Sequence, residues 1–556
     1  MSAPLRPGIR LRLTLLLPFL ASCAPSVDRS VRFDVVEATI PQMQQALGEG
    51  RVTSRELVEA YLVRIATFEE TVNATIAVNP SALQIADSLD RERAAGRVRG
   101  PLHGIPVALK DNIHATDMPT TGGALAFEDF TPPYEATLTK NLEDAGAIIL
   151  AKTVMTELAN FMGAGMPTNY SAVGGYGRNP YDPRRDPREG RNDGRPVMAT
   201  GGSSSGIGTA MSLWAASVGT ETSGSILSPA NQNMLAAVKP TVGRISRYGV
   251  IPITADQDTP GPMARTVTDA AILLGALEGA ATDPNDPATT ACERPADGDY
   301  TRFLRAEGLQ GARIGIPRAN YYDSVQVPGS DRWRGGMSEH ARAVMDTVIT
   351  ILQQQGAVVV DPADIPSIVD PDTANNLLVH GQSMVLDYGM KRDFNLWLAS
   401  LGDGAPVKSL TELREWNLAH GAAGSMKYEQ ARLDGSDTLD LEKDRPAYEA
   451  DRAQDLRLNG EHGIDEVMQA LELDAILFAG GGGAGIAAKP GYPTVIVPFG
   501  FVPNDQGPAF PEGWQAKPQP LGVSFTGRAC SEPRLLELAF AFEQATKRRV
   551  PPPGTR

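Results

Sequence analysis

The sequence contains few cysteines and histidines, which limits the metal chemistry that it can support. There are three cysteines and six histidines in 556 residues. The histidines form no HExxH motif and no other close pair, so we expect no metal site. Cys292 and Cys530 lie far apart in the sequence, and they could form one disulfide or remain as two buried thiols.

The chain also lacks an excess of positive charge. Lys and Arg number 51 against 66 Asp and Glu, so the net charge is -15. Such an acidic surface argues against nucleic acid as a partner. Length alone would allow about two to four domains. No long Gly/Ser or Pro linker and no repeat divides the chain, so we expect one large domain.

The first two dozen residues are typical of an export signal. Three arginines precede a short apolar run from Leu13 to Leu20, which is too short to span a bilayer as a helix. The following LASC resembles a bacterial lipobox and predicts lipidation at Cys23, with a plain secretory signal as the alternative. We assign 1–23 to this signal and 24–35 to a linker. The protein is then expected in the periplasm or outer membrane, with an N-terminal lipid as its only membrane anchor.

A stretch from Thr200 to Ala230 is rich in serine, glycine and threonine and has no lysine or arginine. Apolar residues at helical spacing predict a helix over 204–217 that is buried on one face. Ser203 would stand at the N-terminus of this helix, where free backbone NH groups stabilise negative charge. This composition favours catalytic serines over an ordinary core segment.

Ser225 lies on a glycine-containing turn before a second helix, which Ser228 and Pro229 are expected to open. Such a turn can direct successive NH groups at one point and form an oxyanion hole. The residues that would donate these NH groups are Thr222, Ser223, Gly224 and Ser225.

Lys110 ends a short apolar strand, Ile105 to Leu109, and precedes Asp111 and Asn112. A lysine at a strand end is commonly a solvated charge. If it is buried, however, desolvation lowers its pKa, and a neutral lysine is a competent base. Both interpretations remain open from this segment alone.

The flanking segments predict an α/β layered fold. Two helices are expected within 39–66, the second opened by the capping box of Thr53 and Glu56. A helix over 137–145, a strand over 147–150 and a helix over 154–161 then alternate. The charged segment from Gly174 to Met198 is expected to be an irregular exposed loop, which could form a wall of the active site or be a tolerated insertion.

Gly480 to Gly485 formally match GxGxxG after a predicted strand. A dinucleotide-binding fold requires a long helix next, and Pro490 and Pro493 do not permit one. We therefore expect a close-packed loop near the active site and no cofactor.

Several ordered blocks together resemble the amidase signature family. They include GIPVALKDNI, GGSSSG, GTETSGSI and the long block VKPTVGRISRYGVIPITADQDTPGPMARTVTDAA. The resemblance covers residues 36–548 and implies a single large α/β domain, with a central mixed, twisted sheet covered by helices on both faces. A less matched region at about 285–470 would build the substrate pocket, and 549–556 would form a tail.

The resemblance also implies a mechanism for hydrolysing a carboxylic amide to an acid plus ammonia or an amine. Ser225 would be the nucleophile, Ser203 would be held in a cis peptide, and Lys110 would be the base. Met155, Gly201 and Gly202 would bind the substrate, a small-molecule or peptide amide; anilides, esters and carbamates are further possible substrates. The chain departs from the family in a trimmed spacing between the serines, and at Ser223 and Leu227.

Two alternatives remain at this stage. GSSSG satisfies GxSxG with Ser204 at its centre, which is typical of His-dependent α/β-type serine esterases. PVMATG is a poor strand to lead into that turn, and this alternative leaves Lys110 and Ser225 unexplained. The other alternative is a non-catalytic envelope lipoprotein on an amidase scaffold.

Overall fold

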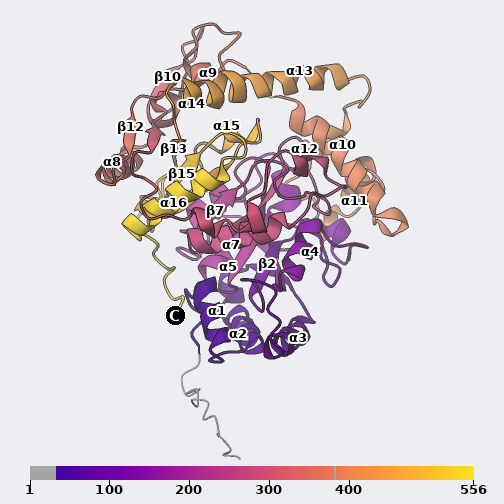
Figure 1. Ribbon diagram of the computed structural model, residues 1–556. Coiled ribbons are helices and arrows are strands. Elements are labelled where there is room, and N and C mark those ends of the chain that lie inside the picture. The colour runs from indigo at the N-terminus through magenta and orange to yellow at the C-terminus, as the bar shows by residue number, and fades with distance from the viewer. Residues whose placement is uncertain (1–32, 381–382) are drawn as a thin grey trace, which may run out of the picture.

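A computed structural model describes residues 33–380 and 383–556 (Figure 1). Cys23, the predicted signal and residues 24–32 of the predicted linker lie outside the described residues. The described chain is organised around one sheet of eleven strands, in the order β1-β3-β2-β6-β8-β7-β14-β15-β13-β9-β12. The strands are β1 (Thr75–Val78), β2 (Pro106–Lys110), β3 (Ile148–Thr153), β6 (Ala216–Glu221), β7 (Ala236–Lys239), β8 (Thr259–Ala264), β9 (Arg313–Gly315), β12 (Val358–Val360), β13 (Ala475–Ala479), β14 (Thr494–Val502) and β15 (Gln519–Thr526).

The sheet is mixed. β2 pairs in parallel with both β3 and β6. The next four pairs in the sheet are antiparallel: β6 with β8, β8 with β7, β7 with β14, and β14 with β15. Because β3, β2 and β6 run in the same direction, their carboxyl ends lie at one edge. Lys110, Thr153 and Glu221 end these three strands.

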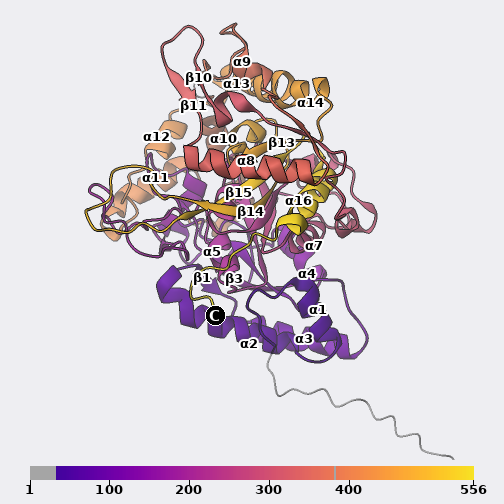
Figure 2. The ribbon, with the colours of Figure 1, turned by 90° about the vertical axis from the view of Figure 1, so that its left-hand side faces the viewer.

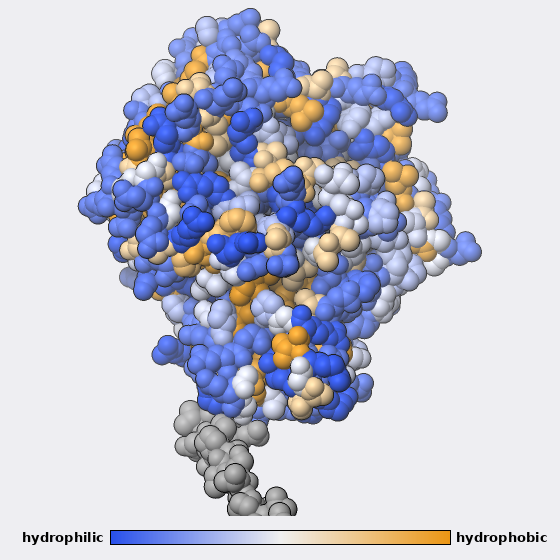
Figure 3. Space-filling model, in the orientation of Figure 1, coloured by the Kyte–Doolittle hydropathy of each residue, from blue (hydrophilic) through white to orange (hydrophobic). Residues whose placement is uncertain are grey.

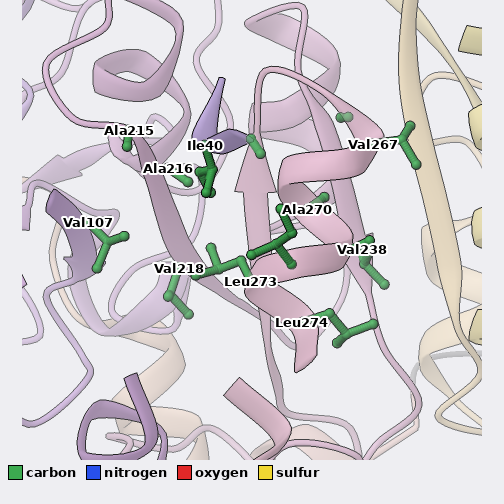
Figure 4. Packing of buried hydrophobic residues seen from close by; sticks show 14 of the residues in the cluster. Ile40, Val107, Ala215, Ala216, Val218, Val238, Val267, Ala270, Leu273 and Leu274 are labelled. Carbon is green, nitrogen blue, oxygen red and sulfur yellow. The ribbon is translucent and has the colours of Figure 1, made fainter. Parts of the chain in front are cut away.

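Helices cover both faces of the sheet. Along β7, Val238 faces a cluster that includes α7 and α16, whereas Ala237 packs in a separate cluster with α6. This alternation follows from the two-residue period of a strand. Figure 4 shows Leu273 and Leu274 of α7 beside Val218 and Val238. The covering helices are α1 (Ile40–Gly48), α2 (Ser54–Val72), α3 (Ala82–Ala94), α4 (Thr137–Asp144), α5 (Ser205–Ala210), α6 (Leu227–Gln232), α7 (Val267–Glu278), α8 (Glu339–Gln354), α15 (Ala484–Ala488) and α16 (Glu532–Thr546).

A helical region, here called the cap, lies away from α1, α2 and α3; part of it forms the opposite end of the molecule and part runs down one side (Figures 1 and 2). It falls within the region that matched the family least, 285–470. Its helices are α9 (Pro366–Val369), α10 (Val385–Ser400), α11 (Leu410–Ala419), α12 (Ala431–Asp437), α13 (Arg445–Leu456) and α14 (Glu466–Ala470). Two small hairpins complete the fold, β4 (Tyr170–Ser171) with β5 (Gly175–Tyr176), and β10 (Ser324–Gln326) with β11 (Trp333–Gly335).

The surface seen in Figure 3 is mainly hydrophilic, with apolar residues scattered among polar ones. Within the part of the chain that is described, no helix combines the length and apolar character needed to cross a bilayer. Cys292 and Cys530, for which the sequence allowed two states, are joined as a disulfide. The tail 549–556 packs on the body, since Arg549 pairs with Glu37 at 2.7 Å and Thr555 is buried.

The starts of the two N-terminal helices agree with the prediction, although α2 continues to Val72, beyond the predicted end at 66. Thr39 and Thr53 both cap with reciprocal capping boxes. The helix predicted over 204–217 is wrong beyond Ala210, because α5 has six residues and a turn leads into β6. In that turn Ser212 has φ 52°, which a right-handed helix does not allow.

The helix predicted over 154–161 is also wrong. Only a single 3-10 turn, Glu157–Asn160, forms there, and Leu158 and Ala159 adopt left-handed backbone angles inside it. The segment 174–198 is irregular as predicted, but it is not exposed throughout. Asp186 and Arg188 form an ion pair with side chains only 2% and 3% exposed. Arg188 also stacks on Phe510 at 4.3 Å, so part of this segment packs against the body of the protein.

Candidate active site

Lys110 is completely buried at the carboxyl end of β2. Its ammonium Nζ donates to the backbone oxygen of Thr220 over 2.9 Å. Burial lowers the pKa of Lys110 to about 8, although the negative charges of Asp258 and Glu221 act in the opposite direction. Desolvation therefore makes the neutral amine accessible near neutral pH.

Two other lysines, Lys152 and Lys239, are also buried among the described residues. Lys152, on the neighbouring strand β3, pairs with Asp111 at 3.2 Å and donates to Thr120 Oγ1 over 2.7 Å. Within residues 33–380 and 383–556, Lys110 has no such carboxylate partner within ion-pair distance. Lys152 is thus held in an ion pair, whereas Lys110 is not. Lys239, at the end of β7, is also buried without an ion pair in the described chain, and burial lowers its pKa to about 8, but it donates to Tyr492 O over 2.7 Å. Lys110 differs from Lys239 in its contact with Thr220, five positions before Ser225, which makes Lys110 the candidate base.

Ser203 lies two residues before α5, at the same edge of the sheet. It forms an isolated antiparallel bridge with Met155, and Ser204 N donates to Val154 O over 2.8 Å. The Ser203 side chain is fully buried, and its Oγ has no hydrogen-bond partner among the described residues. A buried hydroxyl without a partner is costly in a native protein, which marks Ser203 as a functional candidate.

The cis peptide expected before Ser203 is not found. Within the described residues the cis bond is at Asp361–Pro362, so the bond between Gly202 and Ser203 is trans. A trans bond is the ordinary state before a residue other than proline. Gly201, at φ 75°, supplies the turn that brings the chain to Ser203.

Ser225 packs directly against Gly202. A Cβ atom added to Gly202 would lie 2.6 Å from Ser225 Oγ, so only glycine permits this approach. Gly201 is equally restricted by Pro229, whose backbone nitrogen would be 2.3 Å from an added Cβ. The two glycines and Met155, predicted to bind substrate, thus lie beside the serines. The structure shows Gly201 and Gly202 as positions of close packing.

The segment Thr222–Ser225 leaves the carboxyl end of β6 and enters α6. Gly224 has φ 98°. The helix has Ile226 as its N-cap and begins at Leu227, two residues before the start predicted from Ser228 and Pro229. The buried carboxylate of Glu221 accepts from Ile226 N at 2.8 Å and from Leu227 N at 2.9 Å, which holds the far end of this segment. Leu227, where many relatives have arginine, is buried in the α6 cluster.

Exposure differs between the members of the site. Ser223 is exposed, and Thr222, Gly224 and Ser225 are half-buried, whereas Lys110 and Ser203 are buried. A substrate can therefore reach Ser225 and the neighbouring NH groups, while the two proton-transfer candidates stay shielded from water. The four residues 222–225, predicted to form an oxyanion hole, follow the carboxyl end of β6 directly.

Ser204, the centre of the GxSxG match, has a different environment. Its Oγ accepts from Asn169 Nδ2 over 2.8 Å and donates to Asn73 O over 3.4 Å. The residue is buried, and no histidine is among the hydrogen-bond partners of its Oγ in the described residues. The His-dependent esterase interpretation therefore has no geometric support.

Three residues of the site were not predicted from the sequence. Thr220 accepts from Lys110, Glu221 holds the start of α6, and Asp258 contacts Thr222. Glu221 could have been noticed as the sole charged residue between Thr200 and Ala230. Asp258 carried no comparable signal, because its partner is 36 positions away.

Comparisons with known proteins identify the family. A sequence model of the Amidase family matches residues 56–536. A probable amidase of Arabidopsis thaliana is 35% identical over 536 residues, covering 95% of this chain and 94% of the relative. A putative amidase of Arthroderma benhamiae is 32% identical over 555 residues, covering 93% of this chain and 86% of the relative.

Among solved structures, the native peptide amidase from Stenotrophomonas maltophilia superposes with a TM-score of 0.78 at 36% identity, covering 93% of this chain and 98% of that chain. A peptide amidase in complex with the competitive inhibitor chymostatin gives a TM-score of 0.80 at 36% identity, covering 94% and 100%. The match of sequence and fold extends over nearly the whole described chain. The chain therefore belongs to the amidase signature family of enzymes that hydrolyse amide bonds.

Proposed function

We propose that this amidase acts through a relay of Lys110, Ser203 and Ser225. The observation that carries the proposal is a combination at one edge of the sheet: a buried Lys110 that pairs with no carboxylate of the described chain, a buried Ser203 hydroxyl and a half-exposed Ser225. Neutral Lys110 takes a proton from Ser203, and Ser203 takes one from Ser225. The Ser225 oxygen then attacks the amide carbonyl carbon.

The NH groups of residues 222–225 would stabilise the oxyanion, and one such donor is typically worth about 3–4 kcal/mol. The proton held by Lys110 returns through Ser203 to the leaving nitrogen as the C–N bond breaks. Water then attacks the acyl-enzyme, its proton enters the relay, and the acid is released with Ser225 restored. No metal or cofactor is required for these steps.

For the substrate, we propose the terminal amide of a peptide as the first class to test. The support is the 36% identity to a peptide amidase over nearly the whole chain. The purified mature protein should be assayed against a panel of peptide amides, anilides, fatty amides and carbamates, with Ser225→Ala as the blank. Release of ammonia from peptide amides by the wild type alone would support the proposal, and activity confined to another class would reject this substrate.

The non-catalytic alternative is tested by a serine-directed phosphonate probe. Labelling at Ser225, located by mass spectrometry and absent in Ser225→Ala, is expected for the relay. A native protein that incorporates no probe and hydrolyses no amide would instead favour a scaffold function.

We further propose that the protein is exported and lipidated at Cys23. The Cys292–Cys530 disulfide supports this, because such bonds form chiefly in oxidising compartments. Cell fractionation with labelled fatty acid should find the wild type in the envelope and the label absent from Cys23→Ser. A cytoplasmic, unlabelled wild type with both thiols free would reject the proposal.

A further inference from the structure

The turn from Ile253 to Asp258 places the Asp258 carboxylate next to Thr222, the first residue of the segment Thr222–Ser225. Asp258 is 8% exposed, and its two oxygens have different partners. One oxygen accepts from the hydroxyl of Thr222. The other accepts from Ile253 N at 2.7 Å and Thr254 N at 2.9 Å, so the carboxylate itself is fixed by the backbone of its own turn.

Thr222 is the first residue of the segment, and the same turn holds it twice. Gln257 Nε2 donates to the Thr222 carbonyl oxygen over 3.2 Å, in addition to the contact between the Thr222 hydroxyl and Asp258. Glu221 holds the other end of the segment through Ile226 and Leu227. The intervening Ser223 and Gly224 are exposed or half-buried, so the direction of their NH groups depends on these two ends.

The turn is also fastened to the cap. Asp393 of α10 accepts from Ala255 N over 2.7 Å. Asp256 accepts from Tyr448 at 2.9 Å and from Arg392 at 3.1 Å. The position of the Asp258 carboxylate is therefore fixed by the backbone of its own turn, and hydrogen bonds to the cap hold that turn in place.

We propose that Asp258 is a positioning residue for amide hydrolysis, and that it directs the NH groups of residues 222–225 by holding the Thr222 side chain. This rests on the relay and oxyanion segment of the proposed function. Asp258 does not touch the reacting atoms. Its effect is exerted through Thr222, and misplacement of about 1 Å in such a site can cost about 100-fold in rate.

The first test removes the hydrogen bond between the Thr222 hydroxyl and the Asp258 carboxylate by changing one partner at a time. Thr222→Val removes the hydroxyl and Asp258→Asn removes the carboxylate charge, and each is expected to lower kcat by about 10-fold to 100-fold with KM changed less than about 3-fold. Thr222→Ser keeps the hydroxyl and should restore kcat to near the wild-type value. Thr137→Val is the matched control, because its hydroxyl also contacts a carboxylate, that of Asp283, on another element; its kinetics should be unchanged.

The double variant Thr222→Val/Asp258→Asn separates positioning from general damage. If the two side chains act as one contact, its kcat should be no lower than that of the poorer single variant. Fully multiplicative losses, a loss confined to KM, or wild-type kcat in Thr222→Val would each overturn the inference. Thr222 is half-buried, so its valine variant should fold even if Asp258→Asn does not, and thermal melting checks this.

A pH profile adds a second readout. Asp258 and Glu221 are the charged groups that face Lys110. Removing the negative charge of Asp258 should move the acidic limb of kcat/KM to lower pH, whereas Thr222→Val should leave that limb in place. If Ser225→Ala abolishes hydrolysis while Thr222→Val does not slow it, this inference fails and the proposed function stands. If Ser225→Ala retains activity, the proposed function fails.

Discussion

Lys110 Nζ donates a hydrogen bond to the carbonyl oxygen of Thr220 over 2.9 Å, and Thr220 lies five positions before Ser225 in the sequence. The contact ties β2 to the end of β6, which are parallel neighbours. It directs the lysine towards the segment that carries the candidate nucleophile. The base and the nucleophile of the proposed relay are therefore held by the same pair of strands.

The rate of hydrolysis should rise with pH through the pKa of Lys110. Burial lowers this pKa to about 8, and only the deprotonated amine can accept the proton of Ser203. Below about pH 8, kcat/KM should therefore fall roughly tenfold per pH unit, and above it the profile should level off. Measurement of kcat/KM across about pH 6 to 10 checks this, and a flat profile over the acidic half of that range would contradict the role of Lys110.

Replacement of the buried lysines Lys110 and Lys152 should affect different properties: catalysis for Lys110 and stability for Lys152. Lys110→Ala should lower kcat by about 10³-fold or more, because the base is lost, while the fold is retained. Lys152→Met leaves the buried Asp111 carboxylate without its partner, which should cost about 3–5 kcal/mol of unfolding free energy. Steady-state kinetics and urea denaturation of both variants test this. Near-normal turnover in Lys110→Ala would reject the relay.

Gly202→Ala should displace the nucleophile. The new Cβ would lie 2.6 Å from Ser225 Oγ and 2.7 Å from its Cβ, so the side chain must move, with an expected loss of about 100-fold in kcat. Gly48→Ala is the control, since a Cβ there meets nothing within 4 Å. Equal kinetics in the two variants would show that Ser225 tolerates the displacement.

Ser204→Ala should retain catalysis. It removes the hydrogen bonds from Asn169 and to Asn73 O, each worth about 1 kcal/mol of stability, and no proposed proton transfer. Amide hydrolysis at saturating substrate, compared with Ser225→Ala, is the measurement. Loss of turnover in Ser204→Ala with a folded protein would revive the GxSxG interpretation.

The sequence predicted the family, the α/β architecture and the strand end at Lys110, because these depend on local chemistry and on ordered blocks. The capping boxes at Thr39 and Thr53 fix two helix starts through contacts between residues only three positions apart. Periodicity failed between Ala210 and Glu221 because every residue there is buried, so apolar spacing carried no information on which face is covered.

Contacts between distant segments could not be predicted. Asp258 lies next to Thr222 because β8 pairs with β6, and no local sequence pattern predicts that pairing. The packing of segment 174–198 depends on Phe510, which follows it in sequence after the whole cap. Its charges therefore suggested exposure, although Asp186 and Arg188 are paired inside the fold.

The disulfide has a consequence for the integrity of the chain. Cys292 precedes the cap and Cys530 follows β15, so the bond closes a covalent ring with a sequence separation of 238 that contains the whole cap. A protease that cuts a cap loop once would open the ring without separating the pieces. Such a nicked enzyme would migrate as one molecule until it is reduced, because the disulfide would still join its two pieces.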